Sequence, residues 1–159
     1  MARILVTYVS RSGNTEAMAG HVADGARETA GAEVDLRPVD QVPPKSLADY
    51  DALLVGSPTY YGQMAAEVKA LFDASVVLQG QLEGRVGGAF TSAGNLAGGN
   101  ETCLLSILQA MLIHGMVVRG TAQRDHYGPV AIGAPDDRAI GECRKLGRNV
   151  ADLAVALRG

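Results

Sequence analysis

The chain has 159 residues, of which 47% are hydrophobic and 19% charged, and this length and composition predict one globular domain over residues 1–159. Its formal net charge of −3 excludes the basic surface on which nucleic-acid binding depends. The N-terminal run MARILVTYVS is too short for a signal peptide and no stretch has the ~18 apolar residues of a membrane span, so we expect a cytoplasmic protein with no membrane partner.

Short apolar runs alternate with segments of helical periodicity, an order typical of an α/β fold with helices on both faces of a parallel sheet. The strands are predicted at residues 4–9, 34–39, 52–56, 86–92 and 116–119. The second run alternates apolar with charged residues and contains Pro38, both typical of an edge strand. These features predict a three-layer sandwich around a five-stranded parallel sheet of order 2-1-3-4-5.

Helical periodicity predicts four helices, at residues 15–30, 64–78, 101–113 and 136–157. The link between the second and third strands leaves room for a turn or two of helix. The connection over residues 120–135 is long and irregular, and such loops are usually functional or disordered. Cys103 and Cys143 stand far apart, each inside a helical pattern, which favours packing roles over a redox pair or a zinc site.

The turn SRSGNT lies between the first strand and the first helix. The unpaired N–H groups and the positive dipole end of that helix face the turn, and Ser10, Ser12, Asn14 and Thr15 add side-chain donors. We interpret the turn as a phosphate cradle made almost entirely of neutral groups. The alternative is a polar turn that only caps a helix. GxxxxGK[ST], GxGxxG and a cysteine nucleophile are all absent here, which excludes three related kinds of anion site.

Two further segments follow the third and fourth strands, and they should emerge at the same edge of the sheet. GSPTYYGQM, residues 56–64, offers Tyr60 and Tyr61 as flat walls and Gly62 for close backbone approach. FTSAGNLAGGNE, residues 90–101, offers backbone N–H groups in a glycine-rich run. A planar ligand with polar edges and a phosphate tail would suit this set, and flavin mononucleotide (FMN) has that shape.

These three segments, together with IHGMVV at residues 113–118, resemble the flavodoxin-like NAD(P)H:quinone oxidoreductases of the tryptophan-repressor-binding-protein type, nearly end to end. The resemblance implies a flavodoxin-like fold and an FMN-dependent enzyme that takes hydride from NAD(P)H and reduces quinones or similar small acceptors. It implies a possible homo-oligomer. The residues that it implies for FMN binding are Ser10, Arg11, Ser12, Gly13, Asn14 and Thr15 at the phosphate, and Pro58, Thr59, Tyr60, Tyr61, Gly62, Thr91, Ser92, Ala93, Gly94 and Asn95 around the isoalloxazine.

The resemblance also places His114 near the ring, as a catalytic residue that orients substrate or supplies a proton. The alternative is a histidine at a helix C-terminus, where the helix dipole favours it. His126 and Tyr127, in the long loop, either line the pocket or cover it. The chain is about forty residues shorter than typical members of the family, chiefly before the third strand and after the fifth.

Two other functions compete with the quinone reductase. A one-electron carrier of the flavodoxin type usually has a strongly acidic docking face and often a tryptophan beside the flavin, whereas this chain has a charge of only −3 and no tryptophan. A binding or regulatory module would hold flavin as a structural group or not at all.

Overall fold

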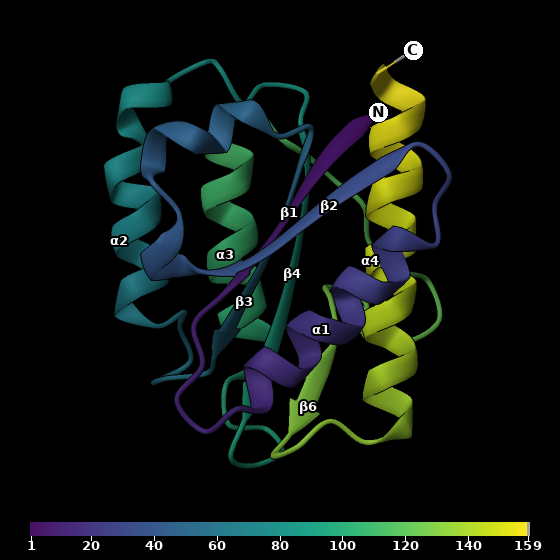
Figure 1. Ribbon diagram of the computed structural model, residues 1–159. Coiled ribbons are helices and arrows are strands. Elements are labelled where there is room, and N and C mark those ends of the chain that lie inside the picture. Colours follow the sequence, from purple (N-terminus) through teal and green to yellow (C-terminus); the bar gives the residue numbers. More distant parts are fainter. Residues whose placement is uncertain (159) are drawn as a thin grey trace.

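The computed structural model describes residues 1–158, and it contains one sheet in which every paired strand is parallel (Figure 1). Its strands are β1 (Ala2–Tyr8), β2 (Ala32–Pro38), β3 (Ala52–Pro58), β4 (Val86–Ala93), β5 (Val117–Val118) and β6 (Val130–Ile132). The order β2-β1-β3-β4-β5 confirms the predicted topology. β2 lies at an edge, as its alternating pattern indicated.

The position beyond β4 is shared by two short strands, which corrects the prediction of one strand at 116–119 and an irregular connection over 120–135. β5 pairs with the first residues of β4, at Val86 and Gly87, and β6 pairs with its last three, from Thr91 to Ala93. β6 has only three residues between a proline and a glycine. A run that short is below the length at which a strand pattern can be recognised.

Two helices cover each face of the sheet (Figure 1). α1 (Asn14–Arg27) and α4 (Asp137–Arg158) lie on one face, and α2 (Ala66–Ala74) and α3 (Asn100–Ile113) on the other. Short 3-10 helices occupy Val39–Gln41, Pro44–Asp49 and Ser75–Leu78, so the helix predicted at 64–78 is an α-helix only in its middle. No helix within residues 1–158 is long and apolar enough to cross a membrane.

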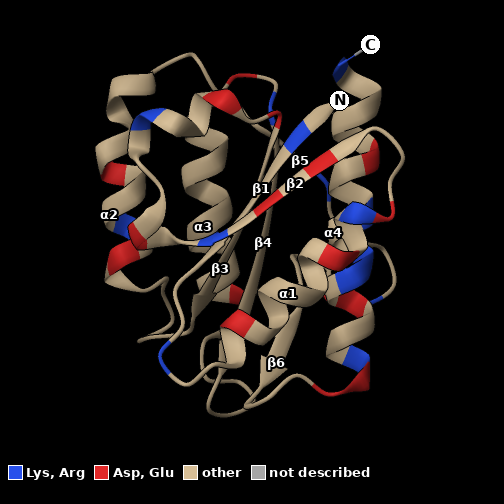
Figure 2. Ribbon diagram, in the orientation of Figure 1, with Lys and Arg blue, Asp and Glu red and all other residues tan. Residues whose placement is uncertain are grey.

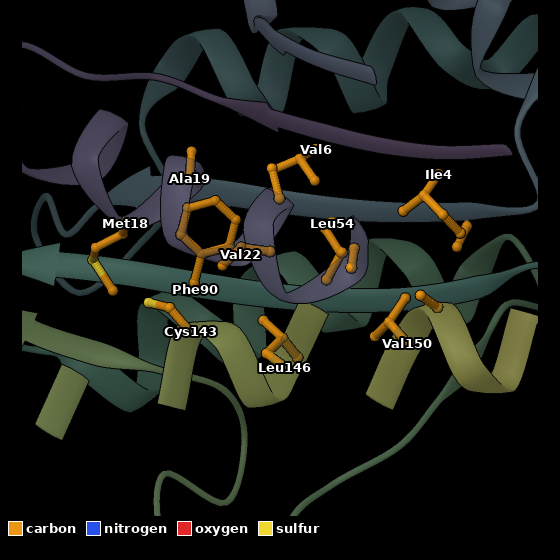
Figure 3. Packing of buried hydrophobic residues seen from close by; sticks show 14 of the residues in the cluster. Ile4, Val6, Met18, Ala19, Val22, Leu54, Phe90, Cys143, Leu146 and Val150 are labelled. Carbon is orange, nitrogen blue, oxygen red and sulfur yellow. The ribbon is translucent and has the colours of Figure 1, made fainter. Parts of the chain in front are cut away.

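Glycines allow the closest packing in the core. A Cβ on Gly147 of α4 would lie 1.9 Å from the carbonyl oxygen of Val22, so α1 and α4 touch through their backbones. A Cβ on Gly56 of β3 would lie 2.1 Å from the ring of Phe90, which fills that space. Figure 3 shows this ring among Met18, Val22 and Cys143.

Both cysteines are free and fully buried, which confirms the packing role predicted for them. Burial raises the pKa of Cys103, and it raises the pKa of Cys143 to about 12, so both sulfurs stay protonated at neutral pH.

Candidate functional site

Three loops meet at the carboxyl ends of β1, β3 and β4, and Ser92 at the end of β4 joins them. The Ser92 hydroxyl lies 2.8 Å from that of Thr15 in α1, and the Ser92 carbonyl accepts the N–H of Thr59 at 2.8 Å. The structure therefore brings the segments at residues 10–15, 58–63 and 91–99 to one rim, where a parallel sheet with this strand order binds its ligands.

The loop at residues 10–15 is organised by Ser10 and Gly13. Gly13 immediately precedes α1 with φ +89°, a conformation that favours glycine, and it has no side chain with which to cap the helix. The Ser10 hydroxyl oxygen accepts the N–H groups of Gly13 and Glu16, each at 3.2 Å. Within residues 1–158 the N–H groups of Asn14 and Thr15 have no acceptor, so the first turn of α1 keeps donors for an anion.

The predicted donor side chains of this loop differ in exposure. Ser12 is exposed, Ser10 and Asn14 are partly buried, and Thr15 is buried against Ser92, whereas Gly13, which has no side chain, exposes its backbone. Thr15 therefore connects the loop to β4, in addition to any contact it makes with a ligand.

The loop after β3 is a tight hairpin that presents an aromatic side chain. Tyr60 and Gln63 exchange two backbone hydrogen bonds, of 3.0 and 2.9 Å, around Tyr61 at φ +49° and Gly62 at φ +74°. Positive φ at both central residues defines a type I′ turn. The left-handed conformation costs Tyr61 ~1–2 kcal/mol, and its side chain is fully exposed. Backbone strain of this kind clusters at functional sites.

Hydroxyl groups hold the base of this hairpin against β4. The Thr91 hydroxyl donates to the carbonyl of Ser57 at 2.7 Å, so the Thr59 hydroxyl is the donor in its 2.8 Å contact with Thr91. The Ser57 hydroxyl oxygen accepts the N–H of Ala65 at 2.8 Å. Pro58 and Thr59 are partly buried within this arrangement, which fixes where the turn at Tyr61 projects.

The glycine-rich loop after β4 lies beside the hairpin. Gly99, at φ +95°, immediately precedes α3, and a Cβ on it would lie 2.5 Å from the Cα of Gly62. Ala93 is partly buried, whereas Gly94, Asn95 and the 81%-exposed Leu96 lie at the surface. Within the described part of the chain the backbone N–H groups of residues 94–97 have no acceptor. This loop, like the start of α1, offers unpaired donors to the rim.

Arg11 bridges the first two loops from the outside. Its Nη2 lies 2.6 Å from Oε1 of Glu67, and its guanidinium carbon lies 4.9 Å from the centre of the Tyr60 ring. The Glu67 backbone N–H, and then Arg11, hold the pKa of the Glu67 carboxyl below its usual value, although burial opposes them. Both side chains of the ion pair are about half exposed, so solvent screens this contact.

His114 does not lie at the rim, and the expectation that it sits near the ring is wrong for the chain by itself. α3 begins at the carboxyl edge and its 14 residues carry the chain about 21 Å back toward the opposite edge, where His114 ends the helix. There the His114 Nε2 lies 2.7 Å from the Ser75 hydroxyl, which donates to the carbonyl of Phe72. His114 therefore donates to Ser75, and partial burial lowers the pKa of His114. The position of His114 agrees with the alternative interpretation, a histidine at the C-terminus of a helix.

A feature that the sequence did not indicate is a cavity of about 530 Å³ on the β6 side of the rim. Leu96, Asn100, Arg124, His126 and Tyr127 line it, with others from β6 and α4. The sequence predicts that His126 and Tyr127 either line a pocket or cover it. The structure places both residues in the wall of this cavity. The only feature of the sequence that pointed to this cavity was the length of the connection over residues 120–135.

The sequence pattern of the family described as Flavodoxin matches residues 6–100. The chain is 36% identical to the NAD(P)H dehydrogenase (quinone) of Caulobacter vibrioides (strain NA1000 / CB15N), over all of both chains, and 39% identical to the flavodoxin of Aquifex aeolicus (strain VF5), over 96% of this chain and 86% of that one. The crystal structure of a WrbA-like flavodoxin from Agrobacterium tumefaciens superposes with a TM-score of 0.84 at 25% identity, covering 98% of this chain and 99% of that one.

The Caulobacter alignment runs over 200 positions, against 159 residues here, so about forty positions have no residue in this chain, as expected. The alignment nevertheless covers the full length of both chains, and the fold, the strand order and the three converging loops agree with it. The chain belongs to the flavodoxin family and, within it, to the flavodoxin-like NAD(P)H:quinone oxidoreductases of the tryptophan-repressor-binding-protein type.

Proposed function

We propose that this protein binds FMN at the rim formed by residues 10–15, 58–63 and 91–99 and transfers two electrons from NAD(P)H to a quinone. In the balanced reaction NAD(P)H, a proton and the quinone become NAD(P)⁺ and the hydroquinone. The observation that carries the proposal is the convergence of two sets of unpaired backbone N–H groups and one strained aromatic hairpin at the same edge of the sheet.

The phosphate of FMN fits the start of α1. The N–H groups of Asn14 and Thr15 are unpaired, Ser12 is exposed, and the positive end of the helix dipole points at the loop. Arg11 is the one positively charged residue of the loop, and it already contacts Glu67. Uncharged N–H and O–H groups would therefore make most of the hydrogen bonds to the phosphate.

The ring of FMN fits between the hairpin and the glycine-rich loop. Tyr60 and Tyr61 offer flat surfaces, and the N–H groups of Gly94 and Asn95 would meet the polar edge of the ring and favour added negative charge there. When bound, FMN supplies the hydride chemistry itself. The chain's residues hold the ring in place and shield one of its faces from water.

The first test is the absorbance spectrum of the purified protein, followed by steady-state assays with NADH or NADPH and benzoquinone. We expect a yellow protein that turns over with at least one nicotinamide. A colourless protein that reduces no quinone after FMN is added would contradict the proposal and favour a binding or regulatory module.

The cradle has a sharper test in Ser12→Asp. Ser12 is exposed, so the fold should tolerate the change, but a carboxylate there repels a phosphate. We expect the FMN dissociation constant to rise at least about tenfold while that of riboflavin, which lacks the phosphate, is unchanged. Ser12→Asn is the neutral control. An equal effect on both flavins would show that the loop does not hold the phosphate.

A second candidate is a one-electron carrier, which the 39% identity to the Aquifex aeolicus flavodoxin favours. The low net charge and the absence of tryptophan argue against it. Anaerobic photoreduction separates the two functions. A stable, well-populated one-electron-reduced state would support the carrier, whereas direct conversion to the two-electron-reduced state supports the oxidoreductase.

A further inference from the structure

We propose that Glu16 and Asp40 determine which flavin the chain accepts, because their carboxylates keep the AMP half of flavin adenine dinucleotide (FAD) out of a groove beside the phosphate loop. The inference rests on the proposed function and adds to it the residues that distinguish FMN from FAD. The two flavins share the ring, the ribityl chain and the first phosphate, and FAD adds a second phosphate and an adenosine. The choice between them therefore depends on what the chain presents beyond the phosphate loop.

The groove lies on the β2 side of the loop at residues 10–15. Its walls come from the end of β1, the first turn of α1, the residues after β2 and one residue of α2, and they include Tyr8, Ser10, Asp40 and Glu67. Ser10 belongs to both features, because its hydroxyl oxygen also accepts the N–H groups of Gly13 and Glu16 within the loop. The groove therefore opens directly beside the proposed phosphate site.

The strand order directs the second half of FAD toward this groove. β2 and β3 lie on opposite sides of β1. The proposed ring site lies between the loops after β3 and β4, so riboflavin reaches the phosphate from the β3 side. A second substituent on that phosphate must avoid both the riboflavin and the backbone of α1, which leaves the β2 side. There residues 38–40 line the groove, so the AMP half would enter it.

Space does not exclude the AMP half. The groove has a volume of about 330 Å³, which lies within the range of ~300–1,000 Å³ that is usual for small-molecule sites. Val9, Pro38 and Val39 give it apolar wall area against which a base can pack. Because the groove is large enough, a rejection of the AMP half must come from its charge.

The groove is negatively charged. Glu16, Asp40 and Glu67 line it, and its lining within the described chain contains no lysine or arginine. Glu67 is compensated by Arg11, whose Nη2 lies 2.6 Å from Glu67 Oε1, but Glu16 and Asp40 have no ion pair within residues 1–158. A second phosphate in the groove would therefore meet two uncompensated carboxylates.

Tyr8 holds one of these carboxylates at the groove. Its hydroxyl donates to Oε1 of Glu16 at 3.0 Å, and the Tyr8 side chain is buried at the end of β1. Burial raises the pKa of Tyr8, and the hydrogen bond to Glu16 and the charges of Glu16 and Asp40 raise it further. The charges of both carboxylates therefore act on the same part of the groove.

The test compares the dissociation constants of FMN and FAD, measured at low salt by calorimetric titration of the flavin-free protein. We expect the wild type to bind FAD at least about tenfold more weakly than FMN. In Glu16→Gln/Asp40→Asn the ratio of the FAD to the FMN constant should fall at least about threefold, and the fall should vanish near 1 M salt, because both carboxylates are exposed and screened. Gln keeps an oxygen for the Tyr8 hydroxyl, so Tm should not change.

Glu33→Gln/Glu83→Gln is the matched control. It removes the same charge at two exposed residues that do not line the groove and that have no ion pair in the described part of the chain. The ratio of the two constants should equal that of the wild type. A fall like that of the groove variant would show that only the net charge of the protein matters.

Asp40→Lys separates charge from shape. Lysine is longer than aspartate and carries the opposite charge, so rejection by charge predicts that FAD binds at least about threefold more tightly than in Asp40→Asn. Rejection by shape predicts the reverse, because the longer side chain fills the groove. FMN affinity should change less than about twofold in Asp40→Asn, since Asp40 follows β2 and lies outside the loop at residues 10–15.

The outcomes are distinct. If the wild type binds neither flavin, the proposed function fails and the inference fails with it. If it binds FMN but reduces no quinone, the proposed activity fails, and the ratio of the two constants still tests the groove. If it binds FAD as tightly as FMN, or if Glu16→Gln/Asp40→Asn keeps the wild-type ratio, the carboxylates do not select the flavin. Weaker FAD binding by Asp40→Lys than by Asp40→Asn would also overturn the proposal.

Discussion

The two edges of the sheet differ in how they satisfy their polar groups. At the carboxyl edge, N–H groups of α1 and of the loop before α3 are unpaired, and Figure 2 shows the loops there with few charged residues. At the amino edge, Asp51 accepts the N–H of Arg3 at 2.8 Å and the guanidinium of Arg85 at 2.7 Å, and it also pairs with Arg158. Donors at the carboxyl edge are left without partners within the described residues, and at the amino edge they stabilise the fold.

Helix direction explains this difference. All four helices follow a strand and begin at the carboxyl edge, so their positive dipole ends and unpaired N–H groups gather there. Their C-terminal ends lie at the amino edge, where a cation such as Arg158 is favoured. If the two edges have separate roles, changes at one should alter FMN binding and changes at the other should alter stability.

The largest effect on binding is expected for Gly99→Ala. The change places a Cβ at φ +95° and 2.5 Å from the Cα of Gly62, so the hairpin and the glycine-rich loop must separate. We expect the FMN dissociation constant, measured by fluorescence titration, to rise about 10- to 100-fold.

Gly84→Ala is the matched control at the amino edge. Gly84 has φ +76° and open space around its Cα, so the substitution brings a similar backbone strain without a clash. It should lower the unfolding free energy by ~1 kcal/mol and leave FMN affinity unchanged. Equal losses of affinity in the two variants would remove the distinction between the edges.

Asp51→Asn should have the next largest effect, on stability. The Asp51 side chain is 14% exposed, and the substitution leaves Arg85 and Arg158 without their carboxylate. We expect a loss of ~1–3 kcal/mol at pH 7 by urea unfolding, with FMN affinity unchanged. Asp49→Asn, at an exposed neighbouring position, should cost much less.

The same variant should flatten the acid limb of the stability curve. Burial acts to raise the pKa of Asp51, but the Arg3 N–H and the guanidinium groups of Arg158 and Arg85 outweigh it and hold the pKa below its usual value. The stability that this carboxylate contributes is therefore full above its unfolded pKa of about 3.9 and is lost as the pH falls through the lower folded value. An equal acid sensitivity in wild type and Asp51→Asn would contradict this assignment.

Much of this division could be predicted from the sequence, because a parallel sheet with alternating helices sends every strand-to-helix loop to one edge. From the sequence alone, that rule places Ser12, Tyr61 and Gly94 at the same edge of the sheet. The error at His114 came from setting the rule aside. A helix that begins after β4 at the carboxyl edge must end at the other edge, and the predicted helix at 101–113 already implied this.

The missed features depend on contacts between distant residues. β6 is defined by the pairing of three residues with the end of β4, and the wall of the cavity includes an ion pair between Asp125 and Arg138, which lie 13 residues apart in the chain. Asn100 reads in the sequence as an ordinary first residue of a helix, and its unpaired Nδ2 follows only from its burial. Spacing along the chain carries no information about such pairings.

The smallest effect is expected for Arg11→Met, which tests whether an ion pair at the carboxyl edge acts on the ligand or only on the fold. Arg11 ties the loop at residues 10–15 to Glu67 and Tyr60, but the ion pair is half exposed and screened. We expect the FMN dissociation rate, measured by stopped-flow fluorescence, to rise only about two- to fivefold at low salt and the difference to vanish near 1 M salt.

The double variant with Glu67→Gln identifies how Arg11 acts. If Arg11 works by holding Glu67, adding Glu67→Gln to Arg11→Met should change nothing further. If Arg11 instead reaches the phosphate, Arg11→Met should weaken FMN far more than riboflavin, and Glu67→Gln alone should tighten FMN by releasing the guanidinium. In that case the cradle would depend on a charge, and the contrast between a neutral ligand edge and a charged structural edge would no longer hold.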